Sequence, residues 1–294
     1  MATSEATPQT ADKSRVGSAS LLRRLAAASL LLGLTAWVAP PRTAGQAAPP
    51  APPPDGQPIQ YPSGGATIDA YIARPQGAAK SPAVIVLHDD LGLNSRFREL
   101  TRQFAQAGFL ALGPHLPSRS KAPASEPRQG SPQRAAVAGL EWRQTVGDLK
   151  AAFTFLEKDP GVDAARISAV GVGWGEFRVW KLAEGTPTLH RAVVFYGVTP
   201  TDDDRLRTIR TPVLGHYAQR DYLITARVLK TKKLLGDRFT YHIYPTVPGF
   251  FGGGTGQLQQ PTGGSVISLP AGPHDASAAA AAKQAWTRTL EFLR

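Results

Sequence analysis

Short apolar runs alternate with longer amphipathic segments from residue 66 to the C-terminus of the chain. The runs are rich in β-branched and aromatic residues, and most lack a polar position, which is typical of strands buried on both faces of a sheet. The predicted strands cover residues 67–73, 83–88, 109–114, 166–171, 191–197, 212–218 and 239–245. Strands separated by helical segments in this way predict an α/β fold with a mainly parallel, twisted sheet and helices on both faces.

The amphipathic segments predict the helices that connect these strands. Apolar residues recur at spacings of three, four and six between about 134 and 158. Residues 95–108 end in a glycine, which suits a helix C-terminus. The alanine-rich residues 276–293 place three large apolar side chains along one helix face. No internal repeat interrupts the pattern, so we expect one domain over residues 61–294.

The N-terminal residues 1–47 have the order of an export signal. Arg23 and Arg24 precede a charge-free, largely apolar run over residues 25–41, and small residues follow. Seventeen residues without charge are also close to the length of a membrane span. The pattern therefore predicts export across the cytoplasmic membrane. It leaves open whether the leader is cleaved, which releases the domain, or retained as an anchor.

The residues between leader and domain are dominated by proline. Residues 48–60 read APPAPPPDGQPIQ. Proline fixes its own backbone and removes an amide donor, so this composition predicts an extended, semi-rigid spacer without helix or strand.

Charge and cysteine content narrow the chemistry. The chain has 33 Lys and Arg against 22 Asp and Glu, a formal net charge of +11, and no cysteine. The basic residues are scattered and are interrupted by three aspartates at 202–204, which argues against a nucleic-acid surface. The absence of cysteine excludes disulfides, thiolate metal sites and a thiol nucleophile. We expect neither a metal site nor a cofactor.

The sequence GVGWGE at residues 171–176 joins a predicted strand to a helical segment. Two stretches precede it, VIVLHDDLGLN (84–94) and GFLALGPHLPSR (108–119). It lies within ISAVGVGWGE (167–176), and it is followed in order by YAQRDYLI (217–224), YHIYPTVPGFF (241–251) and the terminal AWTRTLEFL. Together these stretches resemble the dienelactone hydrolase family of the α/β-hydrolase fold over about residues 60–294. The resemblance implies hydrolysis of carboxylic ester or lactone bonds by a nucleophile, a histidine and a carboxylate.

Two of these three positions lack a reactive side chain. The resemblance puts the nucleophile at Gly173, which cannot attack a substrate, and the histidine at Pro248, which cannot accept a proton. The carboxylate is present as Asp221. Glu176 also stands where the family has a second glycine after the turn. We therefore interpret the chain as a catalytically degenerate hydrolase.

Four further residues are candidates for binding at the former active-site face, and the first three of them match positions of the family. His88 and Asp89 match a His-Glu pair whose carboxylate contacts the nucleophile, and we expect them to form a structural hydrogen bond with a neighbouring element. Arg119 matches a position that holds a substrate carboxylate in some members, although its loop setting favours a solvated charge. Trp174 either fills the pocket beside residue 173 or is a core aromatic.

The long glycine-rich segment 245–275 carries the remaining candidate for catalysis. We expect it to be either a binding rim or disordered. His274 is the histidine in a predicted loop downstream of Asp221, and it is the substitute base if the chain hydrolyses esters or lactones through an activated water.

Three functions follow from the sequence. The favoured one is an exported protein that binds a small molecule or a protein through its former active-site face. The alternatives are an active hydrolase with substitute residues, and an accessory subunit of a larger complex tethered to the membrane by residues 25–41.

Overall fold

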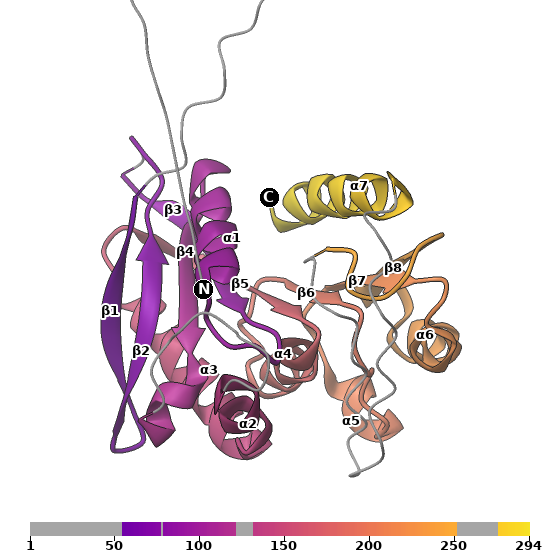
Figure 1. The fold of residues 1–294 in the computed structure, drawn as a ribbon, viewed down its shortest axis with the longest axis horizontal. Helices are drawn as coiled ribbons and strands as arrows, with labels where there is room; N and C mark the ends of the chain where they lie inside the picture. The colour runs from indigo at the N-terminus through magenta and orange to yellow at the C-terminus, as the bar shows by residue number, and fades with distance from the viewer. Residues whose placement is uncertain (1–54, 78, 122–131, 252–275) are drawn as a thin grey trace, which may run out of the picture. The chain divides into compact units, whose positions relative to one another are not determined.

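The computed structural model describes residues 55–77, 79–121, 132–251 and 276–294, and an eight-stranded sheet runs through them (Figure 1). Its strands are β1 (Gly56–Ser63), β2 (Ala66–Ala73), β3 (Ser81–Leu87), β4 (Leu110–His115), β5 (Val162–Val172), β6 (Ala192–Phe195), β7 (Val213–Ala218) and β8 (Phe239–Tyr244). Their order across the sheet is β1-β2-β4-β3-β5-β6-β7-β8. The β1–β2 and β2–β4 pairs are antiparallel and the five other pairs are parallel, which confirms the predicted fold class.

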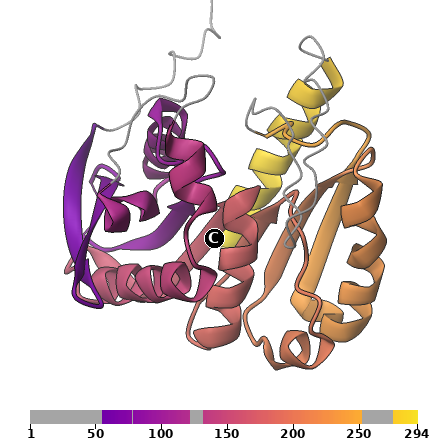
Figure 2. The same ribbon diagram turned by 60° about the horizontal axis from the view of Figure 1, so that its bottom comes forward.

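Helices cover both faces of this sheet (Figures 1 and 2). The α-helices are α1 (Ser95–Gln106), α2 (Pro132–Ala138), α3 (Trp142–Glu157), α4 (Trp174–Gly185), α5 (Asp203–Thr208), α6 (Tyr222–Leu235) and α7 (Ala276–Leu293), and η1 (Leu116–Ser120) and η2 (Gly236–Arg238) are 3-10 helices. One apolar core lies between the sheet and α3, α4 and α6, and the other lies under α1 and α7. This two-sided burial explains why most strands carry continuous apolar runs.

The seven predicted strands are all present, and β1 is an additional one. The predicted spacer boundary at residue 60 is wrong, because pairing with β2 begins at Gly56. β1 lies at the edge of the sheet, where Pro58 and Pro62 need no amide donor on the open side. A Cβ on Gly56 would lie 2.4 Å from the Tyr71 ring, so the start of the strand packs closely on β2.

The helical segment predicted between 134 and 158 is two helices. α2 ends at Ala138, and α3 begins after Glu141, whose carboxylate accepts from the Gln144 N–H at 2.9 Å. Glu141 has an extended backbone and acts as the N-cap. The apolar periodicity continues across the break because Leu140 is buried between the two helices.

The predicted leader and the spacer as far as residue 54 lie outside the described residues. Both interpretations of the leader therefore stay predictions. Within the four described ranges, no helix is long and apolar enough to cross a bilayer.

Candidate functional site

The turn between β5 and α4 has only backbone at its centre. Gly173 has φ 53° and ψ −112°, a conformation that strains any residue with a side chain. Its N–H donates to the Phe195 carbonyl at 3.1 Å, and its carbonyl accepts from the Glu176 N–H at 3.1 Å. The turn is thus fixed between β6 and the first turn of α4.

Two neighbouring glycines make this turn possible. A Cβ on Gly171 would lie 2.8 Å from the Gly175 carbonyl oxygen, and one on Gly175 would lie 2.6 Å from the His88 carbonyl oxygen. Both positions therefore admit only glycine without a shift of the backbone. A Cβ on Gly173 would instead meet the Asp89 Cβ at 3.6 Å, an ordinary van der Waals contact. Residue 173 thus has space for a Cβ atom, although its backbone conformation would be strained.

Asp89 lies beside Gly173 and is held by its own neighbours. Its Oδ1 accepts from the Leu91 N–H at 2.9 Å, and its Oδ2 lies 3.4 Å from Nη1 of Arg96 on α1. Burial raises the pKa of Asp89, and the Arg96 charge opposes that shift. The hydrogen bond predicted between this loop and a neighbouring element is thus present.

Trp174 packs over the turn between two other side chains. Its half-buried indole stacks on the His88 imidazole, with ring centroids 5.6 Å apart and planes 7° apart. The guanidinium carbon of Arg178 lies 3.3 Å from an indole ring centroid. Burial lowers the pKa of His88 to about 3, so this imidazole is neutral. Trp174 also packs against the apolar core. It therefore both covers the turn beside residue 173 and contributes to the core.

His88 has a defined tautomer. Its Nδ1 lies 2.7 Å from the Asp89 carbonyl oxygen, which can only accept, so Nδ1 carries the proton. The imidazole is fully buried, and it makes its hydrogen bond within the loop that follows β3.

Asp221 begins α6 at the carboxyl end of β7. Its Oδ1 accepts from the Ile224 N–H at 3.4 Å, which caps the helix. Only 2% of the residue is exposed, and Oδ2 has no hydrogen-bond partner among the described residues. Burial raises the pKa of Asp221 to about 6.

Pro248 is half-buried in the loop that follows β8. The Arg220 N–H donates to the Thr246 carbonyl at 3.3 Å, which holds this loop against the turn that carries Asp221. Gly173, Asp221 and Pro248 therefore all lie beyond the carboxyl ends of parallel strands, at the edge where open α/β sheets place their sites. His274 lies outside the described residues.

Arg119 does not have the solvated side chain that its loop setting indicates. Its Nε donates to Asp148 Oδ2 at 3.0 Å, and its Nη2 donates to Asp148 Oδ1 and, at 2.9 Å, to the Ser63 carbonyl. Only 15% of the Arg119 side chain and 1% of the Asp148 side chain are exposed. The guanidinium joins η1 to α3 and β1. The prediction of a solvated Arg119 is wrong because these partners hold the side chain inside the fold.

Glu176 is completely buried in the first turn of α4. The Trp180 Nε1–H donates to its Oε1 at 2.6 Å, and burial raises its pKa well above the ordinary value. A Cβ on Gly197 would lie 2.3 Å from Glu176 Oε2, so the missing side chain at 197 provides the space for this carboxyl group.

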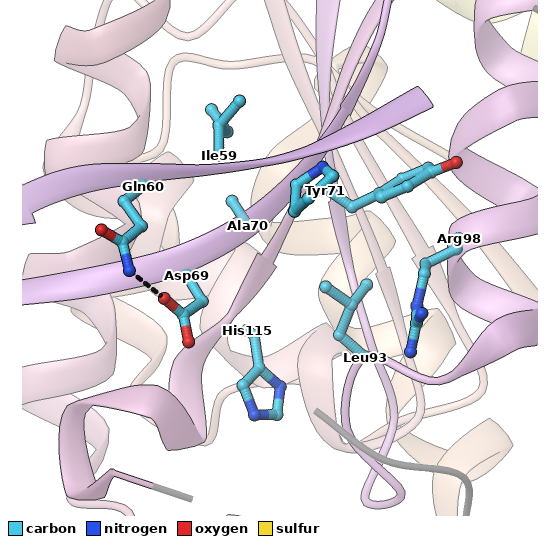
Figure 3. Close-up of a pocket in the computed structure, with 9 residues that line it drawn as sticks. Ile59, Gln60, Asp69, Ala70, Tyr71, Leu93, Arg98 and His115 are labelled. Atoms are coloured by element: carbon cyan, nitrogen blue, oxygen red, sulfur yellow. Dashed lines mark hydrogen bonds between the residues drawn. The ribbon is translucent and has the colours of Figure 1, made fainter. Parts of the chain in front are cut away.

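A cavity of about 440 Å³ lies between β1, β2 and the start of α1 (Figure 3). It is lined by Pro58, Ile59, Gln60, Asp69, Ala70, Tyr71, Leu93, Arg98 and His115. The centroid of the His115 ring lies 6.3 Å from that of His88, so one ring connects the cavity to the packing around Trp174. Nothing in the sequence pattern indicates this cavity, because β1 was predicted to be spacer.

Three residues near the turn were not predicted from the sequence. They are Arg96, Arg178 and Tyr196. Tyr196 has φ 33°, a strained conformation for a residue with a side chain. Burial raises its pKa, and the Arg96 charge opposes that shift. No signal in the sequence identifies the pair of Asp89 and Arg96, because only the fold shows that the two side chains meet.

Comparison with known proteins gives a consistent result. The sequence pattern of the dienelactone hydrolase family matches residues 68–294. A Bradyrhizobium protein named provisionally as a 2-oxo-3-(5-oxofuran-2-ylidene)propanoate lactonase is 30% identical over 190 residues, which is 59% of this chain and 74% of that protein. A Salmonella typhi protein named provisionally as a carboxymethylenebutenolidase is 29% identical over 182 residues, 58% of this chain and 67% of its own length.

Solved structures agree on the fold. A Klebsiella pneumoniae protein named provisionally as a dienelactone hydrolase matches with a TM-score of 0.65 and 24% identity, over 81% of this chain and 98% of that protein. The dienelactone hydrolase-like promiscuous phosphotriesterase P91 from metagenomic libraries matches with a TM-score of 0.60 and 22% identity, over 81% and 97% of the two chains. At these identities the likeness shows the fold.

Proposed function

We propose, from the premise that this chain belongs to the dienelactone hydrolase family, that it is a non-hydrolytic member that binds a ligand or partner. The observation that carries the proposal is Gly173 at the tip of the β5–α4 turn. A family that works by covalent attack needs a nucleophile there, and removing a nucleophile or base from such a triad lowers the rate by several orders of magnitude.

The surroundings of Gly173 support a change of role. The Asp221 carboxylate has one oxygen without a partner in the described part of the chain, and the loop held against it carries proline at 248. Trp174 packs over the turn. The backbone of the site is intact, while two of its three reactive positions have no group that attacks or accepts a proton.

The direct test is an ester and lactone hydrolysis assay on the full chain. We expect turnover of p-nitrophenyl acetate and dihydrocoumarin no faster than in buffer. Turnover that the Asp221→Asn variant abolishes would show that the chain is a working hydrolase with substitute residues. A covalent adduct with a serine-directed fluorophosphonate would show the same.

A gain-of-function pair sharpens this test. Gly173→Cys with Pro248→His supplies a nucleophile and a base to the two positions, and a Cβ at residue 173 makes only an ordinary contact with Asp89. The matched control is Gly173→Ala with Pro248→His, which places the same Cβ in the same strained turn without a thiol. We expect ester hydrolysis only in the cysteine variant. Equal activity in both variants would show that residue 173 is not the nucleophile position.

Export is a second part of the proposal, and the charge and length pattern of residues 1–47 supports it. Expressed in a bacterial host, the full chain is expected in the periplasmic or membrane fraction. N-terminal sequencing of the recovered protein then decides between the two fates of the leader. A start near residue 46 identifies a cleaved signal, whereas an intact N-terminus in the membrane fraction identifies an anchor.

A further inference from the structure

A row of polar side chains crosses the sheet at strands β1, β2 and β4. Asp69 on β2 lies opposite Gln60 on β1 and opposite His115 at the end of β4. Residues directly opposite each other on neighbouring strands direct their side chains to the same face of the sheet. Two positions before or after the row, Tyr71 and Ala111 on that face belong to the core under α1 and α7. The row therefore places a carboxylate and an imidazole on a face that is otherwise apolar.

Hydrogen bonds fix this polar row. Gln60 Nε2 donates to Asp69 Oδ1 at 2.8 Å. The Asp69 N–H donates to the Ser118 hydroxyl at 2.9 Å, and that hydroxyl donates to the His115 carbonyl at 2.6 Å. Among the described residues, Gln60 is the one hydrogen-bond partner of the Asp69 carboxylate. Its Oδ2 is therefore open to a further donor.

The polar row forms one end of the cavity of about 440 Å³. Figure 3 shows Asp69 and His115 on one side of this cavity and Arg98, from α1, on the other, with Leu93 between them. The ring of Tyr71 also lines the cavity, and Arg102 Nη1 holds its hydroxyl at 2.9 Å. Pockets that bind small organic molecules have volumes of roughly 300–1,000 Å³, so this cavity has the size of a ligand site.

The charges at the two ends of the cavity select the class of ligand. The open oxygen of Asp69 suits an ammonium group, which has only donors. A guanidinium has several N–H donors, so Arg98 can bind a ligand carboxylate in addition to a neighbour in the protein. Leu93 and the Tyr71 ring offer apolar surface for the body of the ligand. The net charge of +11 also disfavours a ligand that has an ammonium group alone.

We propose that this cavity binds a small zwitterion whose ammonium and carboxylate groups stand at opposite ends of a short apolar body. The ammonium group is held by Asp69 and the carboxylate by Arg98. Neither Gly173 nor Asp221 lines the cavity, so the site is additional to the former active site and does not depend on the function proposed above.

The test is a titration of the full chain with 4-(aminomethyl)benzoate, followed by saturation-transfer NMR. Its matched probes are 4-methylbenzylamine and 4-methylbenzoate, which each keep one of the two charges. We expect a Kd of about 1 mM or lower for the zwitterion, and binding at least about tenfold weaker for each probe, because each lacks one charge-assisted hydrogen bond. No binding of the zwitterion at about 10 mM overturns the proposal, as does equal or tighter binding of either probe.

Two substitutions locate the ligand. Asp69→Asn should raise the Kd of the zwitterion at least about tenfold and leave that of 4-methylbenzoate unchanged, whereas Arg98→Gln should weaken the zwitterion and not 4-methylbenzylamine. The matched control is Asp237→Asn, which removes an exposed carboxylate outside the cavity and should bind like the parent. If Asp69→Asn does not fold, Arg98→Gln decides the question.

A third substitution separates this cavity from the former active site. Gly173→Ala should bind the zwitterion like the parent, because residue 173 does not line the cavity. Loss of binding in this variant would place the ligand at the β5–α4 turn and overturn the proposal. Unchanged binding in both Asp69→Asn and Arg98→Gln would overturn it as well.

Discussion

The turns that begin α4 and α6 are held in opposite ways. Gly173 begins α4 through backbone hydrogen bonds and the close approach of Gly171 and Gly175, with no side-chain cap. Asp221 begins α6 through its own carboxylate, which accepts from the Ile224 N–H. The first turn keeps its geometry without a functional side chain, whereas the second has a side chain with a structural task.

This difference explains which residues of the family pattern are present. Asp221 caps a helix and Arg119 pairs with the buried Asp148, so both make structural contacts whether or not the chain hydrolyses anything. A side chain at residue 173 contributes no such contact and would add strain at φ 53°. Glycine is therefore favoured there once the chemistry is not required. A retained acid is, by the same argument, weak support for catalysis.

The strongest test of this reasoning is Arg119→Ala. The change leaves the Asp148 carboxylate buried without its cation, and we expect a loss of about 3 kcal/mol in the free energy of unfolding, measured by urea denaturation. Arg119→Ala combined with Asp148→Asn removes the uncompensated charge and should recover part of the loss. A loss below about 1 kcal/mol for the single change would indicate that Arg119 is free to bind a ligand.

The glycines of the β5–α4 turn provide the next test. Gly175→Ala drives a Cβ into the His88 carbonyl and should cost about 3 kcal/mol, whereas Gly173→Ala strains only its own backbone and should cost about 1 kcal/mol. Urea denaturation of both variants measures the two losses. If the losses were equal, the space at residue 173 would not be available to a side chain.

The fold was predictable because its signal is repeated along the chain. Most of the parallel strands are buried on both faces and therefore have their own apolar runs, whereas the edge strand β8 is partly exposed. β1 was missed because an edge strand needs no such run, and its prolines are typical of a spacer. The break before α3 was missed because Leu140 keeps the apolar spacing through a non-helical residue.

The candidate site was predictable only at the turns. Gly171 and Gly175 mark a close approach of backbones that the sequence displays directly. The pairs Asp89 with Arg96 and Arg119 with Asp148 depend on how elements pack, and spacing along the chain does not specify them. The sequence alone shows which residues a local turn requires. Which side chains from separate elements become partners can be known only from the folded structure.

Asp221 should make stability depend on pH. Its pKa in the folded chain is about 6 against an ordinary 3.8, so between these values the native state holds a proton that the unfolded state has lost. Stability from this group is present below about pH 4 and falls as pH rises through 6, by about 2 kcal/mol. Asp221→Asn keeps a capping side chain and removes the titration. Between pH 4 and pH 7, the free energy of unfolding of the Asp221→Asn variant should rise by about 2 kcal/mol relative to that of the parent, measured by urea denaturation. A constant difference would place the carboxylate in contact with solvent.

The smallest expected effect isolates the cap. At pH 4, where the charge on Asp221 contributes least, Asp221→Asn should match the parent, while Asp221→Ala leaves the Ile224 N–H without its acceptor and should lose about 1 kcal/mol. Thermal unfolding of the three proteins at this pH measures the difference. Equal losses for Asn and Ala would mean that the side-chain oxygen at residue 221 does not hold the turn through the Ile224 hydrogen bond. In that case Asp221 would have no capping task, and its presence would again favour a chemical role.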